Sequence, residues 1–471
     1  MTARSKEDLW HLESGIDVSH SGNQASIAFN VARVSWPKIV STVIENLNVA
    51  LSSVEQDTQI RAEGDAIFDE LQQLRSEIDR SSTIPPLLGD GGNDIEGYNM
   101  ELETLRPVSW HNSPWMYTEC YLFRRLQTCF ARRKSEFWQE YDIWAEQKLA
   151  NTKMSGKVIF ELVEWFLALR SRFIDPKNGT SPLLADHRIA IEDLLQISLW
   201  GNTADLLSLL AISPEELQSR QGFQARKHLK NNLVVDDTDQ VVNLLEQVRA
   251  ETHRDREIHI VVDNAGFELI SDLVLVAYLL CGNFTDKIVL HGKKFPWYVS
   301  DATQNDFDTV LSSLSSPGAV FTDHGRLGES SSLPTFYSLI RSYLCSNPPR
   351  LTFTADPFWT TAHPFARLPT FAHNLYKSLQ DADLVIFKGD LNYRKLIAGG
   401  RWPADTPFEV AIGPLKDMNL RILTLRTCKG DTCVGLRKGQ VEEIDPAGKG
   451  EWTRNGQFGV ISFFDGKPKE A

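Results

Sequence analysis

The first half of the chain repeats its hydrophobic residues with the period of a helix. Apolar positions between residues 39 and 47 fall on one helical face, and Ser35-Trp36-Pro37 before them resembles a helix start with a capping hydroxyl. Further helices are predicted over residues 57–79, 113–125, 155–173 and 190–210, the last interrupted at 200–205. Residues 213–240 turn polar and are interpreted as a linker or surface excursion.

After about residue 255 the period changes to that of short strands separated by helices. Strands are predicted over 258–262, 287–290, 319–322, 351–354, 384–387, 420–425 and 458–464. Helices are predicted between several of them, over 267–280, 304–315, 333–345 and 370–380. Strands that alternate with helices favour a parallel sheet covered on both faces. We therefore expect an α/β protein, with a mostly helical domain over residues 1–240 and an α/β domain over 241–471.

Composition and charge narrow the classes of function. The chain has 471 residues and a formal charge of −13, so counterion release gives it no advantage on nucleic acid, and no such partner is expected. A basic pocket for a small phosphorylated molecule is still compatible with this charge. No signal-like segment opens the chain, and the longest apolar stretch, 273–285, is too short to span a bilayer. The six cysteines show no paired spacing, so we expect free thiols and a reducing compartment, the cytoplasm or the nucleus. No membrane partner is expected.

Polar residues of matching chemistry follow four of the predicted strands. Asp263 and Asn264 close the first, and the strand at 287–290 leads to Asp301. The strand at 384–387 runs into a segment that begins Lys388-Gly389-Asp390 and ends at Arg394, and the strand at 420–425 runs into Arg426-Thr427-Cys428-Lys429. In a parallel sheet all four endings lie along one edge, which is where ligands bind.

This combination fits hydrolysis of a phosphate ester. Asp263, Asn264 and Asp301 would supply oxygens to a hard divalent cation, and Lys388, Arg394 and Lys429 would supply positive charge for an anion. Backbone amides at a helix start after Asp390 could hold phosphate oxygens, and Gly389 would permit close approach. Each feature also has an ordinary structural interpretation: an Asx turn at 263–266, a helix cap at Asp301, and surface residues at Lys388, Arg426 and Lys429.

The segment 113–125 is predicted to be an aromatic-rich helix of a bundle. It begins Ser113-Pro114-Trp115 and contains one acid, Glu119, and the pair Arg124-Arg125. We interpret it as a buried helix whose arginine pair lies on the solvent face.

Several of these motifs together resemble the damage-control phosphatase family, within the subfamily that carries an Arg-Thr-x-Lys signature. They are Asp263 to Glu268, Pro296 to Asp301, Lys388 to Arg394, Arg426 to Lys429, Ser113 to Trp115 with Glu119 to Tyr121, and Ile197 to Asn202. The resemblance covers residues 33 to 465 in order, with a poor match over 314–368. It implies a three-layer α/β/α Rossmann-like sandwich preceded by a helical bundle.

The resemblance also implies a function and its residues. The activity would be a metal-dependent phosphatase that acts on sugar phosphates such as fructose 1-phosphate and, in some members, fructose 6-phosphate. The ion would be Mn²⁺ or Ni²⁺, with Co²⁺ or Mg²⁺ as alternatives. Metal and catalytic residues would be Asp263, Asn264 and Asp301. Substrate would contact Asp263, Asn264, Asp390, Leu391, Asn392, Tyr393, Arg394 and Lys429. Glu119 and Asn202 match motifs without an assigned role.

Two other functions stay open at this point. Relatives of this subfamily have been described as S-adenosylmethionine-dependent methyltransferases of protein carboxylates, which would recruit Glu268 and Asp301 to the methyl donor. No glycine-rich loop after an early strand supports such a cofactor. A non-catalytic binding protein with the same fold is the second alternative. The sequence leaves the oligomeric state open.

Overall fold

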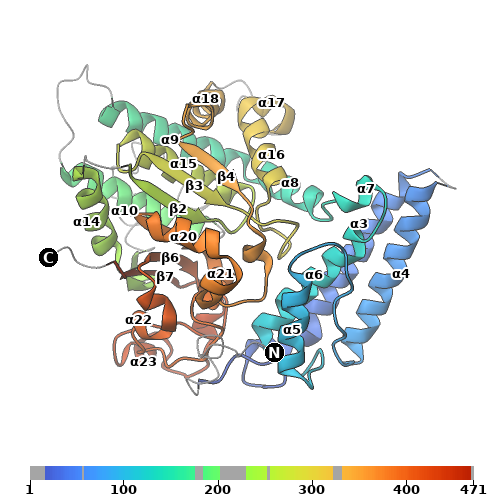
Figure 1. Ribbon diagram of the computed structural model, residues 1–471. Coiled ribbons are helices and arrows are strands. Elements are labelled where there is room, and N and C mark those ends of the chain that lie inside the picture. The colour runs from blue at the N-terminus through green and yellow to red at the C-terminus, as the bar shows by residue number, and fades with distance from the viewer. Residues whose placement is uncertain are drawn as a thin grey trace.

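The computed structural model describes residues 16–55, 58–174, 184–201, 230–251, 255–321 and 331–467. A seven-stranded sheet with the order β1-β7-β6-β5-β2-β3-β4 forms its centre (Figure 1). The strands are β1 (Leu233–Asp236), β2 (Glu257–Val261), β3 (Lys287–His291), β4 (Leu351–Thr354), β5 (Leu384–Lys388), β6 (Arg421–Thr427) and β7 (Gly459–Asp465). From β6 through β5, β2 and β3 to β4, each strand is parallel to its neighbour.

Helices cover both faces of the sheet, as the alternation of side chains along the strands requires. In β5, Leu384 and Ile386 join one hydrophobic core, and Val385 and Phe387 join another. The first core takes in α9 (Gly156–Ile174), α10 (Leu184–Trp200), α14 (Thr238–Ala250), α15 (Phe267–Cys281), α16 (Gln304–Ser315) and α18 (Ser332–Leu344). The second core takes in η5 (Pro357–Thr360), η6 (Phe365–Arg367), α19 (Leu368–Phe371), α20 (His373–Asp381), α21 (Gly389–Leu396), α22 (Phe408–Ala411) and η7 (Gly413–Asp417). The expected three-layer α/β/α sandwich is confirmed.

A helical bundle with its own core precedes the sandwich and lies beside it (Figure 1). It contains α2 (Ile27–Asn30), η2 (Val31–Ser35), α3 (Trp36–Ser52), α4 (Gln59–Asp79), α5 (Ile95–Leu105), α6 (Trp115–Ala131) and α7 (Glu136–Gln139), and α8 (Ala145–Met154) leads from it to α9. Trp297 and Leu391 of the sandwich are part of the bundle's core. The bundle therefore packs directly on two segments that follow strands of the sheet.

The structure corrects three of the predicted elements. Residues 317–320 form α17 (Pro317–Val320) rather than a strand over 319–322. Proline suits the first turn of a helix, and the Phe321 amide donates to the Pro317 carbonyl at 2.8 Å to close that turn. The interpretation of 213–240 as linker misses β1, whose four residues are too few for a clear periodicity. Ser35 makes no capping hydrogen bond with its side chain, because η2 runs directly into α3.

The sheet is also mixed rather than parallel throughout, since β7 runs antiparallel to β6 and parallel to β1. Between β6 and β7 the chain forms only α23 (Gln440–Ile444) and η8 (Glu451–Thr453). The Cys428 amide donates to the Phe458 carbonyl at 2.8 Å, and the Gly456 amide donates to the Cys428 carbonyl at 2.9 Å. These bonds hold the end of β6 beside the start of β7, so β7 must run back across the sheet.

Two helices that precede residue 240 belong to the sheet's own cover. Leu162 of α9 and Leu195 of α10 lie in the same core as the α15 side of the sheet. The domain boundary expected at residue 240 stays a prediction. Across the described ranges we find no helix long and apolar enough to cross a bilayer.

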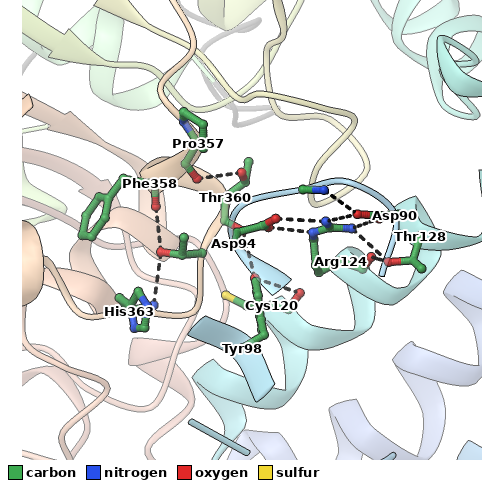
Figure 2. Close-up of polar contacts among 12 residues, drawn as sticks. Asp90, Asp94, Tyr98, Cys120, Arg124, Thr128, Pro357, Phe358, Thr360 and His363 are labelled. Atoms are coloured by element: carbon green, nitrogen blue, oxygen red, sulfur yellow. Dashed lines mark hydrogen bonds and ion pairs between the residues drawn. The ribbon is translucent and has the colours of Figure 1, made fainter. Parts of the chain in front are cut away.

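The arginine pair of α6 does not lie on the solvent face as predicted. Arg124 has a side chain only 3% exposed, and its guanidinium is clamped between two carboxylates from the preceding loop (Figure 2). Its Nη1 lies 2.7 Å from Asp90 Oδ2, and its Nε lies 2.6 Å from Asp94 Oδ2. Arg124 Nη1 also donates to Thr128 Oγ1 at 2.9 Å. This buried cluster ties the loop before α5 to the centre of the bundle.

Replacement of Arg124 tests the importance of this cluster. Arg124→Met should lower the free energy of unfolding by about 3–5 kcal/mol, because two buried carboxylates lose their cation. Arg132→Met is the matched control, since Arg132, directly after α6, contacts Glu70 of α4 with a side chain 33% exposed, and such pairs contribute about 1 kcal/mol or less. Urea denaturation would measure both. Equal losses in the two variants would contradict this account.

Candidate active site

The candidate active site lies where the sheet reverses its winding direction. From β2 the chain proceeds outward to β3 and β4, whereas β5 and β6 lie on the other side of β2. Asp263 and Asn264 follow β2, and α21 begins directly after β5. The carboxyl ends of these adjacent parallel strands therefore form the crevice in which α/β proteins bind ligands.

The structure brings Asp263, Asn264 and Asp301 together at this crevice. The Asp263 carbonyl accepts from the Ala302 amide at 2.8 Å, and Asn264 forms an antiparallel bridge with Asp301. Asn264 Nδ2 donates to Asp263 Oδ2 at 3.0 Å, and Asn264 Oδ1 accepts from the Ser300 hydroxyl. Two carboxylates and one amide from separate strand ends thus share one corner.

The loop after β3 returns Asp301 to the end of β2 in a strained conformation. Lys293 Nζ lies 3.1 Å from Asp301 Oδ2 and donates to a backbone oxygen at the end of β2 at 2.9 Å. Tyr298 and Val299 have φ values of 43° and 69°, in a backbone region that residues other than glycine rarely adopt. The Tyr298 ring stacks on Phe123 of α6 with 4.5 Å between ring centroids. Packing from the bundle therefore holds the strained turn that places Asp301.

Negative charge is crowded around Asp263. Burial raises the pKa of Asp263 well above its ordinary value, and the charges of Asp301 and Glu268 raise it further, while Lys293 and Lys429 oppose the rise. A local excess of carboxylates that nearby lysines offset only in part is the environment of a cation site.

Gly389, the first residue of α21, lies against the Asp263 carboxylate. Its φ is +84°, and a Cβ on this residue would lie 2.0 Å from Asp263 Oδ2. The helix that begins here has no side-chain cap on its first amides. Only glycine therefore permits α21 to start against Asp263, which places the first backbone amides of the helix beside this carboxylate.

Asp390 is held beside Lys429 by two arginines. Arg426 Nε and Arg394 Nε donate to its two carboxylate oxygens, each at 2.9 Å. Burial opposes ionisation of Asp390, but Arg426 and Arg394 together hold its pKa below the usual range. The Lys429 backbone amide lies 3.4 Å from Asp390 Oδ1, and the Lys429 side chain is half-buried. The Arg-Thr-x-Lys segment thus fixes the first turn of α21, rather than being an exposed pair.

Arg394 joins α21 to the bundle. Its Nη2 lies 3.1 Å from Glu119 Oε2, and its guanidinium stands 4.2 Å above the Trp115 ring. Its Nη1 is buried and has no hydrogen-bond partner among the described residues. Glu119, which had no role in the sequence-based interpretation, therefore orients an arginine of the candidate site.

The side chains of the three residues between Asp390 and Arg394 point elsewhere. Leu391 packs in the bundle core. Asn392 Nδ2 donates to the Lys388 carbonyl at 2.7 Å, and the Tyr393 hydroxyl accepts from the Val434 amide at 3.0 Å. Their role as substrate contacts stays a prediction, and it would have to use their backbone. Asn202 lies outside the described residues.

Lys388 does not supply charge to an anion in the crevice as predicted. Its Nζ is buried between Glu268 and Asp272 of α15, because the pleat turns residue 388 toward that helix. The sequence-based analysis also missed Lys293 and Asp272. Glu268 and Asp272 are spaced by one helical turn in an otherwise apolar helix, and that spacing could have indicated a buried charge cluster.

Comparison with known proteins decides the family. The model of the damage-control phosphatase ARMT1-like domain matches residues 31–444. The chain belongs to this family.

Two relatives that match nearly the whole chain in sequence agree with this membership. The damage-control phosphatase ARMT1 of Mus musculus is 32% identical over 466 residues, covering 94% of this chain and 97% of the relative. That of Danio rerio is 30% identical over 458 residues, covering 93% and 95%. The solved structure of a DUF89 family protein from Pyrococcus horikoshii is 14% identical, with a TM-score of 0.39, and covers 91% of this chain and 96% of that one. Membership in the damage-control phosphatases supports a phosphatase of metabolites and does not favour the methyltransferase alternative.

Addition of a methyl group at Gly389 tests the contact between this residue and the Asp263 carboxylate. Gly389→Ala should reduce phosphatase activity at least tenfold, because the new Cβ displaces the Asp263 carboxylate. Gly439→Ala is the matched control: its φ is +85°, and nothing lies within 4 Å of the added atom. Both variants bear the backbone strain of about 1–2 kcal/mol. Phosphate release and unfolding would be measured for both, and equal activity would refute the contact's importance.

Proposed function

We propose that the protein is a divalent-metal-dependent phosphatase that hydrolyses sugar phosphates such as fructose 1-phosphate. The observation that carries the proposal is the meeting of Asp263, Asn264 and Asp301 beside the uncapped start of α21 and the half-buried Lys429. The arrangement combines oxygen donors for a cation with amide and ammonium donors for a phosphate. Family membership supports the phosphatase class.

The chemistry of the donor set fits a hard divalent cation. Two carboxylates and an amide oxygen are ligands of the kind that Mn²⁺ and Mg²⁺ prefer, with water and substrate completing the shell. Within the described ranges no three His, Cys, Asp or Glu side chains converge on a metal site. The proposed set has only two such side chains, because Asn264 is the third ligand. Burial and then the charges of Asp301 and Glu268 raise the pKa of Asp263, and a bound divalent cation would favour its ionised form.

The chain's own residues would position the ester. A bound divalent ion would supply polarisation of a phosphoryl oxygen and a lowered pKa for an attacking water. Lys429 and the first amides of α21 would bind the remaining phosphate oxygens and offset the charge of the transferring group. Asp390 would be kept ionised by Arg426 and Arg394. Arg394 Nη1 would donate to the substrate, since a buried donor with no partner in the described part of the chain points to a ligand.

The ion is proposed to be Mn²⁺ or Ni²⁺, with Co²⁺ and Mg²⁺ as alternatives, and the substrate range to include fructose 6-phosphate.

Removal of the metal tests the proposal. Phosphate release from fructose 1-phosphate should fall to background in EDTA and return when Mn²⁺ or Ni²⁺ is added in excess. Equal rates with and without the chelator would overturn metal dependence, and methyl incorporation into protein without phosphate release would favour the methyltransferase.

Substitution of the ligands gives a separate test. Asp263→Asn and Asp301→Asn should each reduce kcat/KM by about a hundredfold or more, because metal assistance contributes several kcal/mol. Asp308→Asn makes the same chemical change on the exposed face of α16 and should leave the rate unchanged. Steady-state phosphate release would measure all three. Full activity in either ligand variant would exclude that residue from the site.

Loss of the Lys429 ammonium should weaken binding of the phosphate. Lys429→Ala is expected to reduce kcat/KM by roughly 10–100-fold, since a hydrogen bond to a charged group contributes about 1.5–3 kcal/mol. Lys438→Ala, at an exposed position nearby in the sequence, is the control. The comparison would use fructose 1-phosphate at saturating Mn²⁺. Matching kinetics of the two variants would remove Lys429 from the substrate site.

A further inference from the structure

A buried cluster of one lysine and two acids lies behind Asn264, between the sheet and α15. Lys388 Nζ lies 3.0 Å from Glu268 Oε1 and 2.6 Å from Asp272 Oδ1, and it donates to the Ser198 carbonyl at 2.8 Å. None of the three charged side chains is more than 4% exposed. The Ser198 hydroxyl donates to Asp272 Oδ1 at 2.6 Å. The end of β5, α15 and α10 together therefore hold Glu268 in one position.

The second oxygen of Glu268 contacts the amide of Asn264. Asn264 Nδ2 donates to Glu268 Oε2 at 2.7 Å and to Asp263 Oδ2 at 3.0 Å, and Asn264 Oδ1 accepts from the Ser300 hydroxyl. A carboxylate only accepts hydrogen bonds, so it requires the nitrogen of the amide on its own side. The oxygen must then face Ser300, and the Ser300 hydroxyl uses only one of its two lone pairs.

We propose that Glu268 is a positioning residue that fixes the side-chain amide of Asn264 so that its oxygen, and not its nitrogen, faces the cation. Lys388 and Asp272 hold Glu268 in place for this task. The inference rests on the proposed function, because it assigns Asn264 as a ligand. Groups that orient a ligand from behind typically change metal affinity 10–100-fold when they are replaced.

Metal binding without substrate tests the proposal. Glu268→Gln has nearly the same shape, but its amide can donate or accept, so residue 268 no longer requires the nitrogen of Asn264 on its side and only the longer bond to Asp263 still does. Calorimetric titration of the metal-free protein with Mn²⁺ should give a Kd about 10–100-fold higher than that of the wild type. Glu101→Gln is the control, because it makes the same chemical change in a carboxylate of the bundle. Glu101 Oε2 lies 2.6 Å from Arg367 Nη1, and the variant should keep the wild-type Kd.

A double-mutant cycle separates orientation from general structural damage. In Asn264→Asp both ends of the side chain carry oxygen, so nothing remains for Glu268 to orient. Adding Glu268→Gln to that variant should raise the Kd for Mn²⁺ by less than about twofold, although the same substitution alone raises it tenfold or more. A purely structural role of Glu268 predicts the same loss in both backgrounds, and that result would overturn the proposal.

The remaining outcomes distinguish this inference from the proposed function. A wild-type protein that binds none of Mn²⁺, Ni²⁺, Co²⁺ and Mg²⁺ would refute the metal site itself. Wild-type binding with an unchanged Kd in Glu268→Gln would refute only the positioning role. If Glu268→Gln does not fold, Ser300→Ala tests the amide from its oxygen side. It should raise the Kd for Mn²⁺ several-fold, and an unchanged Kd would refute the positioning account.

Discussion

The contact between the Asp263 carboxylate and the backbone of Gly389 constrains the rest of the active site. Two adjacent parallel strands, β2 and β5, end at the same edge, and the chain leaves each of them directly into site residues. Any side chain at residue 389 would occupy the place of the Asp263 carboxylate. A positive φ at Gly389 therefore lets α21 begin beside the Asp263 carboxylate.

The lysines near this contact are shared unevenly among the buried carboxylates. Lys388 forms ion pairs with Glu268 and Asp272, and Lys293 forms one with Asp301. Asp263 has no lysine within ion-pair distance in the described parts of the chain, and burial with its acidic neighbours raises its pKa. The divalent cation of the proposed function would offset this excess of negative charge. The same crowding in a closed core would only destabilise the fold.

The sequence predicted the positions of the strand ends better than the directions of the side chains on them. Five of the seven predicted strands lie in the parallel part of the sheet within one or two residues of their observed bounds, because buried strands have a clear pattern. Lys388 was misjudged because the pleat, which the sequence does not show, decides whether a residue faces the crevice or α15. Arg124 was misjudged because its partners, Asp90 and Asp94, lie in a distant loop. Helical periodicity reports only local neighbours.

The helical bundle completes the site rather than only covering it. Glu119 of α6 holds Arg394, and Phe123, one turn later on the same helix, stacks on Tyr298 in the strained turn before Asp301. Strained backbone persists only where surrounding packing enforces it, so α6 supports both Arg394 and the turn that places Asp301. Because one helix contacts both Arg394 and the turn before Asp301, a change in how the bundle packs would move these two residues together.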